Sequence, residues 1–479
     1  MAHSFAMSTL GAAAATSALL YGRRSEDDYT GLCHPGTREE YLEALKEWAN
    51  DGPSEERVRW VNGQAGAGKT AILRSFCDWL RNRPGAFFFA WKTDVDRNTL
   101  NKLPATIAYQ LLQKIPALDD HMKKALTEEP LLLQFTFEEQ MQRLIVAPLL
   151  DAAQAVAKER HIIIVIDGLD ELDARGQYQF LKYIPTFLSK LSPLPISILV
   201  SSRPETQITG AFQVLALAYI TKAIRLGASD EDIAKYLDDT FANINCRFPY
   251  LQLLHGIWPS AERRRMMLVQ SSGLFIWPTV ALEYIDKVGE GKRHNERLEI
   301  VFSSSTAGIW TDSPLDKLYK AILNAHAPKD RTSVRFLHFK RRLALLCLPV
   351  RVAGYVVDRL VKPIDYSPPA IYAIFEESLE NIQDSITDLA SLFALDSCTV
   401  VSDGISPLPK PSHRSFRDFI LSQQRCGDDF YYRSEQELRT EIVCKLISFF
   451  STADAYDEVR HAVMILGSLL TPSPRKALS

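Results

Sequence analysis

The sequence predicts an α/β fold built on a doubly wound parallel sheet, followed by all-helical and winged-helix domains. Up to residue 226, four apolar runs alternate with helical patterns, which is typical of parallel sheets with right-handed crossovers. From Ser229 onward, strand patterns nearly vanish and helical patterns follow one another. Two short strand-like segments, residues 393–395 and 399–402, then suggest the small hairpin of a winged helix.

A glycine-rich segment lies between the first predicted strand, residues 57–61, and a predicted helix, residues 70–80. It fits G-x-x-x-x-G-K-[ST] at every fixed position, in the strand–loop–helix context that a P-loop requires. Glycines let such a loop turn its backbone N–H groups toward phosphate oxygens, and the following helix adds the positive end of its dipole. The candidate nucleotide-contacting residues are Gly63, Gln64, Ala65, Gly66, Ala67, Gly68, Lys69, Thr70 and Ala71.

Two side chains of this loop and one strand end form a candidate magnesium and phosphate site. Lys69 offers an ammonium group to the β- and γ-phosphates, and Thr70 offers a hydroxyl to Mg²⁺. A buried strand pattern over residues 161–166 ends on Asp167, at the edge where ligands of open α/β sheets bind. Asp167 is therefore the candidate second magnesium contact.

Asp170 and Glu171 follow Asp167 after one short turn. A carboxylate at this place can orient or deprotonate an attacking water, so both are candidate catalytic residues. The alternative is that they cap the next helix, because helix N-termini favour acidic residues. The next strand, residues 196–200, leads to Arg203, which could sense a γ-phosphate.

Composition limits the classes of protein. The chain has 479 residues, enough for about three domains, and its net charge of −3 offers no large basic field for nucleic acid or an anionic membrane. Seven cysteines without a C-x-x-C pair favour reduced thiols in a cytoplasmic protein. Residues 5–21 are apolar but lack preceding positive charge. We expect them to belong to a disordered tail, with a weak membrane anchor as the alternative.

These patterns divide the chain into five parts. They are an N-terminal tail (1–36), a nucleotide-binding domain (37–226), a helical domain (227–330), a winged-helix domain (331–425) and a C-terminal helical remnant with a tail (426–479). A helix over residues 37–49 opens the second part, and Thr37 and Glu40 are its expected capping box. His413 opens a helix near the end of the fourth part.

Four segments together resemble the NACHT-type STAND P-loop NTPases, in particular the nephrocystin-like NACHT proteins of fungi. They are GQAGAGKT in the P-loop, VIDGLDEL around Asp167, LVSSRPE around Arg203 and HRSFRDFI from His413. The upstream segment CHPGTR, residues 33–38, is also similar. The resemblance covers residues 30–425, and the second and fourth segments are its more diagnostic parts.

The resemblance implies a signalling switch that closes around ADP, opens when ATP replaces it, and hydrolyses ATP slowly with Mg²⁺. It implies that His413 contacts the β-phosphate of ADP and holds the closed state, and that Arg203 is a sensor. It also implies protein partners (effector or sensor chains), an ATP-dependent homo-oligomer, and a role in immunity-like or self/non-self signalling. The charge balance, by contrast, is what argues against nucleic acid and disfavours a membrane as partners.

Other classes stay open or are disfavoured. A scaffold that binds nucleotide without hydrolysing it is the main alternative. A winged-helix nucleic-acid binder is disfavoured by the acidic balance. A GTPase is disfavoured because Asn101-Lys102-Leu103-Pro104 lacks the aspartate of the N-K-x-D pattern, and no signature of an ABC-type ATPase is present.

Overall fold

The computed structural model describes residues 4–19, 31–92, 94, 96–159, 161–286, 294–306, 313–347, 389, 391–395 and 409–426, with residues 431, 434, 437, 440, 441 and 444. The chain forms two compact units, Met1–Ile276 and Trp277–Ser479. The division falls inside the stretch predicted as one helical domain, residues 227–330. The first half of that stretch therefore belongs to the same unit as the sheet.

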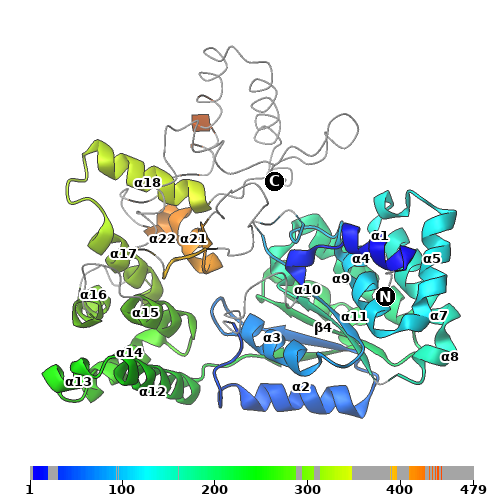
Figure 1. The fold of residues 1–479 in the computed structure, drawn as a ribbon, viewed down its shortest axis with the longest axis horizontal. Helices are drawn as coiled ribbons and strands as arrows, with labels where there is room; N and C mark the ends of the chain where they lie inside the picture. Colours follow the sequence, from blue (N-terminus) through cyan, green and yellow to red (C-terminus); the bar gives the residue numbers. More distant parts are fainter. Residues whose placement is uncertain are drawn as a thin grey trace. The chain divides into compact units, whose positions relative to one another are not determined.

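A five-stranded, wholly parallel sheet forms the centre of the first unit (Figure 1). Its order is β2-β3-β4-β1-β5. The strands are β1 (Val58–Asn62), β2 (Gly85–Phe89), β3 (Ile162–Asp167), β4 (Ile196–Ser202) and β5 (Thr221–Arg225). The predicted doubly wound sheet is confirmed, and β5 is an additional edge strand that the sequence patterns did not predict.

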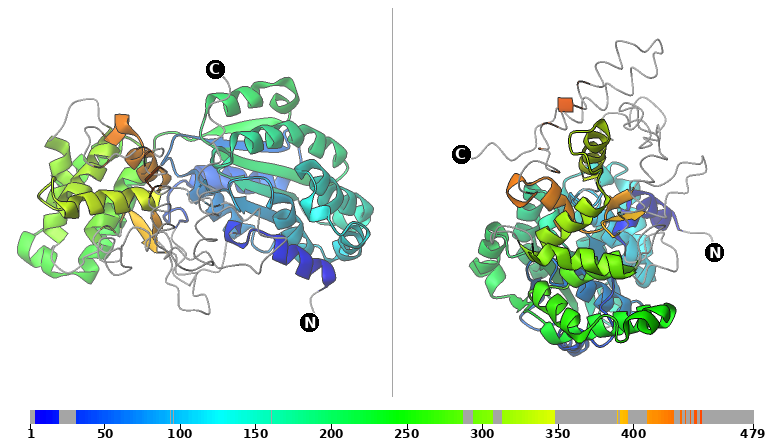
Figure 2. Two further views of the ribbon diagram at one scale, coloured as in Figure 1. Left: turned by 90° about the horizontal axis from the view of Figure 1, so that it is seen from above. Right: turned by 90° about the vertical axis from the view of Figure 1, so that its left-hand side faces the viewer.

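Helices cover both faces of the sheet (Figures 1 and 2). On β3, Ile162, Ile164 and Ile166 belong to one core with α1, α4, α9 and α10, whereas Ile163 and Val165 belong to the other core with α2 and α3. This alternation follows from the two-residue period of a strand. These helices are α1 (Phe5–Ala13), α2 (Glu39–Asp51), α3 (Lys69–Trp79), α4 (Leu103–Lys114), α9 (Ala174–Lys190) and α10 (Thr206–Gln213).

The prediction of a disordered N-terminal tail is wrong for α1. Ser4 caps this helix, and Ala6 and Leu10 are fully buried against α4 and α5. The small residues that gave no clear helical signal pack closely here, because an ideal Cβ on Gly11 would lie 3.1 Å from the Tyr109 ring. Residues 5–13 therefore form part of the nucleotide-binding domain's own core.

Further helices complete the first unit. Between Phe137 and Val156 the helical chain is interrupted by a π-helical segment at Gln142–Val146 and by a break at Ala152. The remaining helices of this unit are α5 (Asp119–Glu128), α6 (Phe137–Met141), α7 (Ala147–Asp151), α8 (Ala153–Val156), α11 (Leu215–Ala218), α12 (Asp230–Arg247), α13 (Tyr250–His255) and α14 (Ala261–Ser271).

The predicted capping box of α2 is wrong. Arg38 is the N-cap residue and has a left-handed backbone (φ 56°), with no side-chain cap hydrogen bond. The Thr37 hydroxyl instead donates to the carbonyl of His34 at 2.7 Å. The chain therefore enters α2 through a sharp turn whose amide at Arg38 is bonded to Asp232 on α12.

The second unit is largely helical in its described part. An aromatic cluster of Tyr319, Phe393, Phe416 and Phe419 fills its core, and Arg425 pairs with buried Asp316. Its elements are α15 (Ile276–Asp286), α16 (His294–Thr306), α17 (Pro314–His326), α18 (Val334–Cys347), β6 (Phe393–Leu395), β7 (Pro409–Pro411), α21 (Arg414–Ile420) and α22 (Gln423–Cys426).

The predicted hairpin is found in part. The strand at Phe393–Leu395 exists, but the structure pairs it antiparallel with Pro409–Pro411. The predicted partner, residues 399–402, lies outside the described residues, as does most of 426–479. A winged-helix domain therefore stays a prediction. Over the described stretches of the chain, no helix is long and apolar enough to cross a membrane.

Candidate nucleotide-binding site

The glycine-rich loop joins the fully buried strand β1 to helix α3. Gly66 and Gly68 have φ values of 78° and 91°, in the left-handed region where a side chain costs free energy. Gly68 is the N-cap of α3, so the helix begins at Lys69. The first turn of α3 therefore presents its N–H groups at the loop, as an anion-binding site requires.

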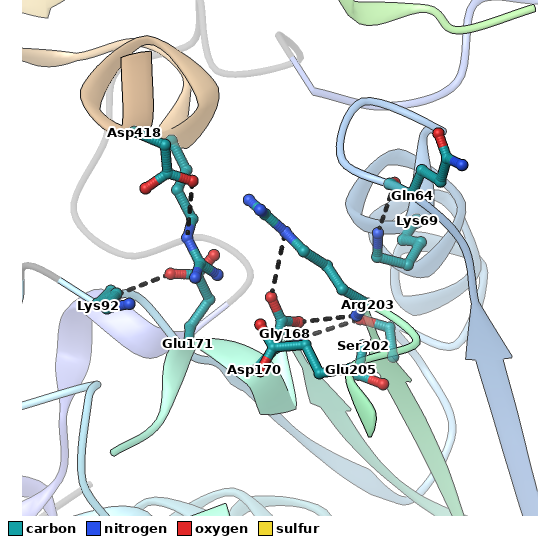
Figure 3. A network of polar contacts seen from close by, with 12 residues as sticks. Gln64, Lys69, Lys92, Gly168, Asp170, Glu171, Ser202, Arg203, Glu205 and Asp418 are labelled. Carbon is teal, nitrogen blue, oxygen red and sulfur yellow. Dashed lines mark hydrogen bonds and ion pairs between the residues drawn. The ribbon is translucent and has the colours of Figure 1, made fainter. Parts of the chain in front are cut away.

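Lys69 curls back over the loop. Its Nζ donates to the carbonyl oxygen of Gly63 at 2.8 Å, and to that of Gln64 at 2.9 Å (Figure 3). Burial lowers the pKa of Lys69, and the nearby carboxylates, Asp170 first among them, act in the opposite direction. The ammonium therefore lies within the electric field of the carboxylates at the C-terminal end of β3. The sequence predicted that these groups share one edge of the sheet.

Thr70 and Asp167 meet beside Lys69. The Ser201 hydroxyl donates to Oδ1 of Asp167 at 2.5 Å, and the Thr70 hydroxyl lies near enough to lower the pKa of the same carboxyl. Burial raises the pKa of Asp167, while these two hydroxyls act to lower it. A carboxylate and a hydroxyl are hard oxygen ligands, so this pair fits Mg²⁺, which commonly takes its remaining ligands from phosphates and water.

Asp170 is held by Arg203. Oδ1 of Asp170 accepts from the Arg203 backbone N–H at 3.0 Å, and Oδ2 lies 3.3 Å from Nε (Figure 3). The carboxylate is 5% exposed, so its charge is balanced by a partner in a low-dielectric place. This pair ties the end of β3 to the end of β4, the two strand ends at which the sequence placed these residues.

Glu171 has a different environment. Its Oε2 accepts from the backbone N–H of Lys92 at 3.2 Å, and the residue is only partly buried. Neither Asp170 nor Glu171 caps the next helix, because Asp173 does so by accepting from Gly176. The alternative interpretation of these two acids as helix caps is therefore wrong.

His413 lies in the second unit, at the N-cap of α21, where it is partly buried. The helix it opens packs through Phe416 and Phe419 into the core of that unit. A contact of His413 with nucleotide stays a prediction.

Sequence reasoning missed three contributors to the site. Ser201 bridges Asp167 and the backbone N–H of Gly168. Ile276 packs on the loop, where an ideal Cβ on Gly66 would lie 2.1 Å from its Cγ2. The buried Arg38 donates to the carbonyl of Ala67 at 3.0 Å. The CHPGTR segment was the available signal for Arg38, whereas nothing local distinguishes Ser201 or Ile276.

The strand order and the glycine-rich loop define an α/β P-loop NTPase fold. With the site, they identify an ATPase-like nucleotide-binding protein. Residues 36–203 match the family described as Nephrocystin 3, N-terminal. Over 84 residues the chain is 33% identical to the vegetative incompatibility protein HET-E-1 of Podospora anserina. That match covers 17% of this chain and only 6% of the relative.

Solved structures are similar at a low level. The Walker-type ATPase PABY2304 of Pyrococcus abyssi has a TM-score of 0.37 and 15% identity, over 80% of this chain and 94% of that chain. The ORC1 protein of Aeropyrum pernix, solved in complex with DNA, has a TM-score of 0.33 and 13% identity, over 80% and 91%. At such scores, the fold assignment depends on this chain's own strand order and loop.

Proposed function

We propose that the chain is a NACHT-type STAND switch that binds ATP and ADP with Mg²⁺ and hydrolyses ATP slowly. The observation that carries the proposal is the meeting of Thr70 and Asp167 beside Lys69, at the start of α3. The family match over residues 36–203 and the short similarity to HET-E-1 support the NACHT assignment. Immunity-like signalling through protein partners or a homo-oligomer in the cytoplasm is part of the same proposal.

The residues divide the work of hydrolysis. The loop N–H groups and Lys69 bind the phosphates, and Thr70 and Asp167 would hold Mg²⁺, which supplies neutralising charge on the phosphate oxygens. Glu171 or Asp170 aligns the attacking water, and Glu171 is our first choice because it is partly exposed, whereas Asp170 is buried against Arg203. Arg203, fixed by Asp170, is the γ-phosphate sensor in this scheme, and His413 is the latch on ADP.

The test is the identity of the nucleotide that copurifies with the protein, released by acid and separated by ion exchange. We expect ADP at about one molecule per chain, and none in Lys69→Ala, which loses the ammonium that neutralises the phosphates. Added ATP and Mg²⁺ should then be turned over slowly. A wild-type protein without nucleotide, and without affinity for added ADP, would refute the proposal.

A scaffold that binds nucleotide without turnover is the second candidate. The burial-raised pKa of Asp167 and the pairing of Asp170 with Arg203 are compatible with a structural ligand as well as with a substrate. Single-turnover hydrolysis of bound ATP separates the two functions, because a scaffold leaves ATP intact.

A further inference from the structure

Arg38 is a buried arginine just upstream of α2. It is 3% exposed, and its backbone lies in the left-handed region at φ 56° and ψ 21°. This conformation costs a non-glycine residue about 1 kcal/mol or more. Arg38 keeps it in a segment that is fixed on both sides, because Thr37 bonds back to His34 and the Arg38 amide donates to Asp232.

The guanidinium contacts the backbone of the P-loop. Nη2 donates to the carbonyl of Ala67 at 3.0 Å, and Nη1 donates to the carbonyl of Gly227 at 3.2 Å. Nε lies 3.9 Å from the Asp232 carboxylate at the start of α12. One side chain therefore joins the phosphate loop, the segment after β5 and helix α12.

Two aromatic rings hold the guanidinium in place. The Tyr41 ring on α2 is 5.6 Å from the guanidinium carbon, and the Phe275 ring is 5.2 Å from it. Both distances are in the range of cation–π attraction, which a planar guanidinium supports better than a hydrated ammonium. The position is thus built for arginine in particular.

The hydrogen bond to the Ala67 carbonyl also sets the direction of the N–H in the same peptide group, that of Gly68. The peptide between Ala67 and Gly68 is not among the cis bonds of the described backbone, and in a planar trans peptide the C=O and N–H point in opposite directions. When Arg38 holds the Ala67 carbonyl, the Gly68 N–H is turned away from Arg38. Gly68 directly precedes Lys69 and α3, so its N–H belongs to the phosphate-binding edge of the loop.

We propose that Arg38 is a positioning residue that fixes the Gly68 N–H for a nucleotide phosphate and couples the phosphate loop to α12 through Asp232. This inference depends on the proposed nucleotide binding. It places the conformation of the loop under the control of a helix outside the sheet, since Asp232 belongs to the first turn of α12.

The test compares Arg38→Lys and Arg38→Met with Arg57→Lys as a matched control. Arg57 also donates to backbone carbonyls, those of Leu188, Leu191, Leu194 and Ile196, but it precedes β1 at the opposite end from the P-loop. The dissociation constant of a fluorescent ADP and the melting temperature without nucleotide are measured for every variant.

We expect both Arg38 variants to weaken ADP binding, Arg38→Met by about tenfold, which corresponds to one hydrogen bond that involves a charged group, and Arg38→Lys by less. Arg57→Lys should lower the melting temperature without changing the ADP dissociation constant. Asp232→Asn should weaken ADP binding less than Arg38→Met does. Its effect should disappear in the Arg38→Met background, since the two residues act in series.

Two outcomes distinguish failure of the inference about Arg38 from failure of the proposed function. If the wild type binds ADP and both Arg38 variants bind it equally well, Arg38 is only structural and the inference is overturned, whatever happens to the melting temperature. If the wild type itself does not bind ADP, the proposed function fails instead. Arg38→Lys keeps the charge, so it decides the question should Arg38→Met fail to fold.

Discussion

Asp170 and Glu171 are neighbours in the chain, but their carboxylates have different partners. Asp170 is paired with Arg203, whereas Glu171 accepts from the backbone N–H of Lys92 and is partly exposed. We predict that Glu171→Gln keeps ATP and ADP affinity near normal and slows hydrolysis by about 100-fold, the usual scale for losing a general base. Asp170→Asn should instead weaken ATP more than ADP, because Arg203 loses its anchor.

Titrations with each nucleotide and single-turnover assays measure both effects. Unchanged turnover in Glu171→Gln, together with lost turnover and intact ATP affinity in Asp170→Asn, would exchange the two assignments.

Ser201 hydrogen-bonds directly to Asp167, the proposed magnesium ligand. Its hydroxyl stabilises ionised Asp167, whose pKa burial raises. Ser201→Ala removes one of the two hydroxyls that lower this pKa, so protons compete better with Mg²⁺ at the carboxylate. We predict that the variant loses more Mg²⁺-dependent ATP affinity in mildly acidic than in mildly alkaline buffer.

Ser202→Ala is the control for that experiment. Ser202 is equally buried on β4, but its hydroxyl bonds to the Trp60 indole. An equal loss of affinity across the pH range in Ser201→Ala would show that Ser201 does not act through ionised Asp167.

The sequence predicted the site residues that belong to a recognisable motif. It missed those that reach the site from elsewhere in the fold. Lys69, Thr70 and Asp167 have positions that the phosphate chemistry dictates, and the structure brings them together. Arg38 approaches the loop only because the chain turns sharply before α2. Ser201 acts because β3 and β4 are adjacent. Such contacts depend on tertiary neighbours that no local pattern records.

At the scale of elements, α1 is a helix that local signals undervalue. Leu10 is fully buried in the core beneath it, while Phe5 on the same helix is 52% exposed. We predict that Leu10→Ala lowers the free energy of unfolding of the first unit by about 2–4 kcal/mol, the cost of a core cavity. Phe5→Ala should change it by less than about 0.5 kcal/mol. Urea unfolding measures both, and equal small effects would mean that α1 is not docked in solution.

Gly66 sets how closely Ile276 approaches the P-loop. An added Cβ would meet Ile276 at 2.1 Å, and the backbone is left-handed as well. Gly52 has a similar φ of 84° but nothing within 4 Å of such a Cβ. We predict that Gly66→Ala lowers the melting temperature clearly more than Gly52→Ala, because only the former adds a clash to the backbone strain. Equal shifts in melting temperature would mean that backbone strain alone, and not the clash with Ile276, destabilises Gly66→Ala.

Strand β5 shows the limit of pattern-based prediction for elements. Its sequence, Thr221–Arg225, has no apolar run, and its residues are exposed or partly buried at the sheet edge. It forms because the chain passes beside β1, whose backbone groups it satisfies. The other four strands are largely buried and were predicted, including β2 at the opposite edge of the sheet, whereas the side chains of β5 are exposed or partly buried and give no apolar signal.

At the scale of the whole molecule, the two compact units meet in the chain at Ile276 and Trp277. The predicted domain boundary at residue 226 followed the last strand pattern, but α12 and α14 lie in the same unit as the sheet. The reason lies in polar contacts and close packing that composition does not record. Arg38 and Asp232 join α12 to the loop, and Gly273 has its ideal Cβ position 2.4 Å from Ala228.

The switch proposal makes a prediction about both units together. ADP bound at Lys69 and Thr70 should raise the melting temperature of the first unit by mass action. If His413 is the latch, ADP should also raise that of the second unit, whose core includes the helix that His413 opens. Differential scanning calorimetry with and without ADP should show both shifts in the wild type and only the first in His413→Ala.

Arg425→Lys, which weakens the pair with Asp316 inside the second unit, is the control: it should lower the second transition and leave its ADP shift in place. A second transition that ignores ADP in the wild type would reject the latch and leave nucleotide binding by the first unit standing.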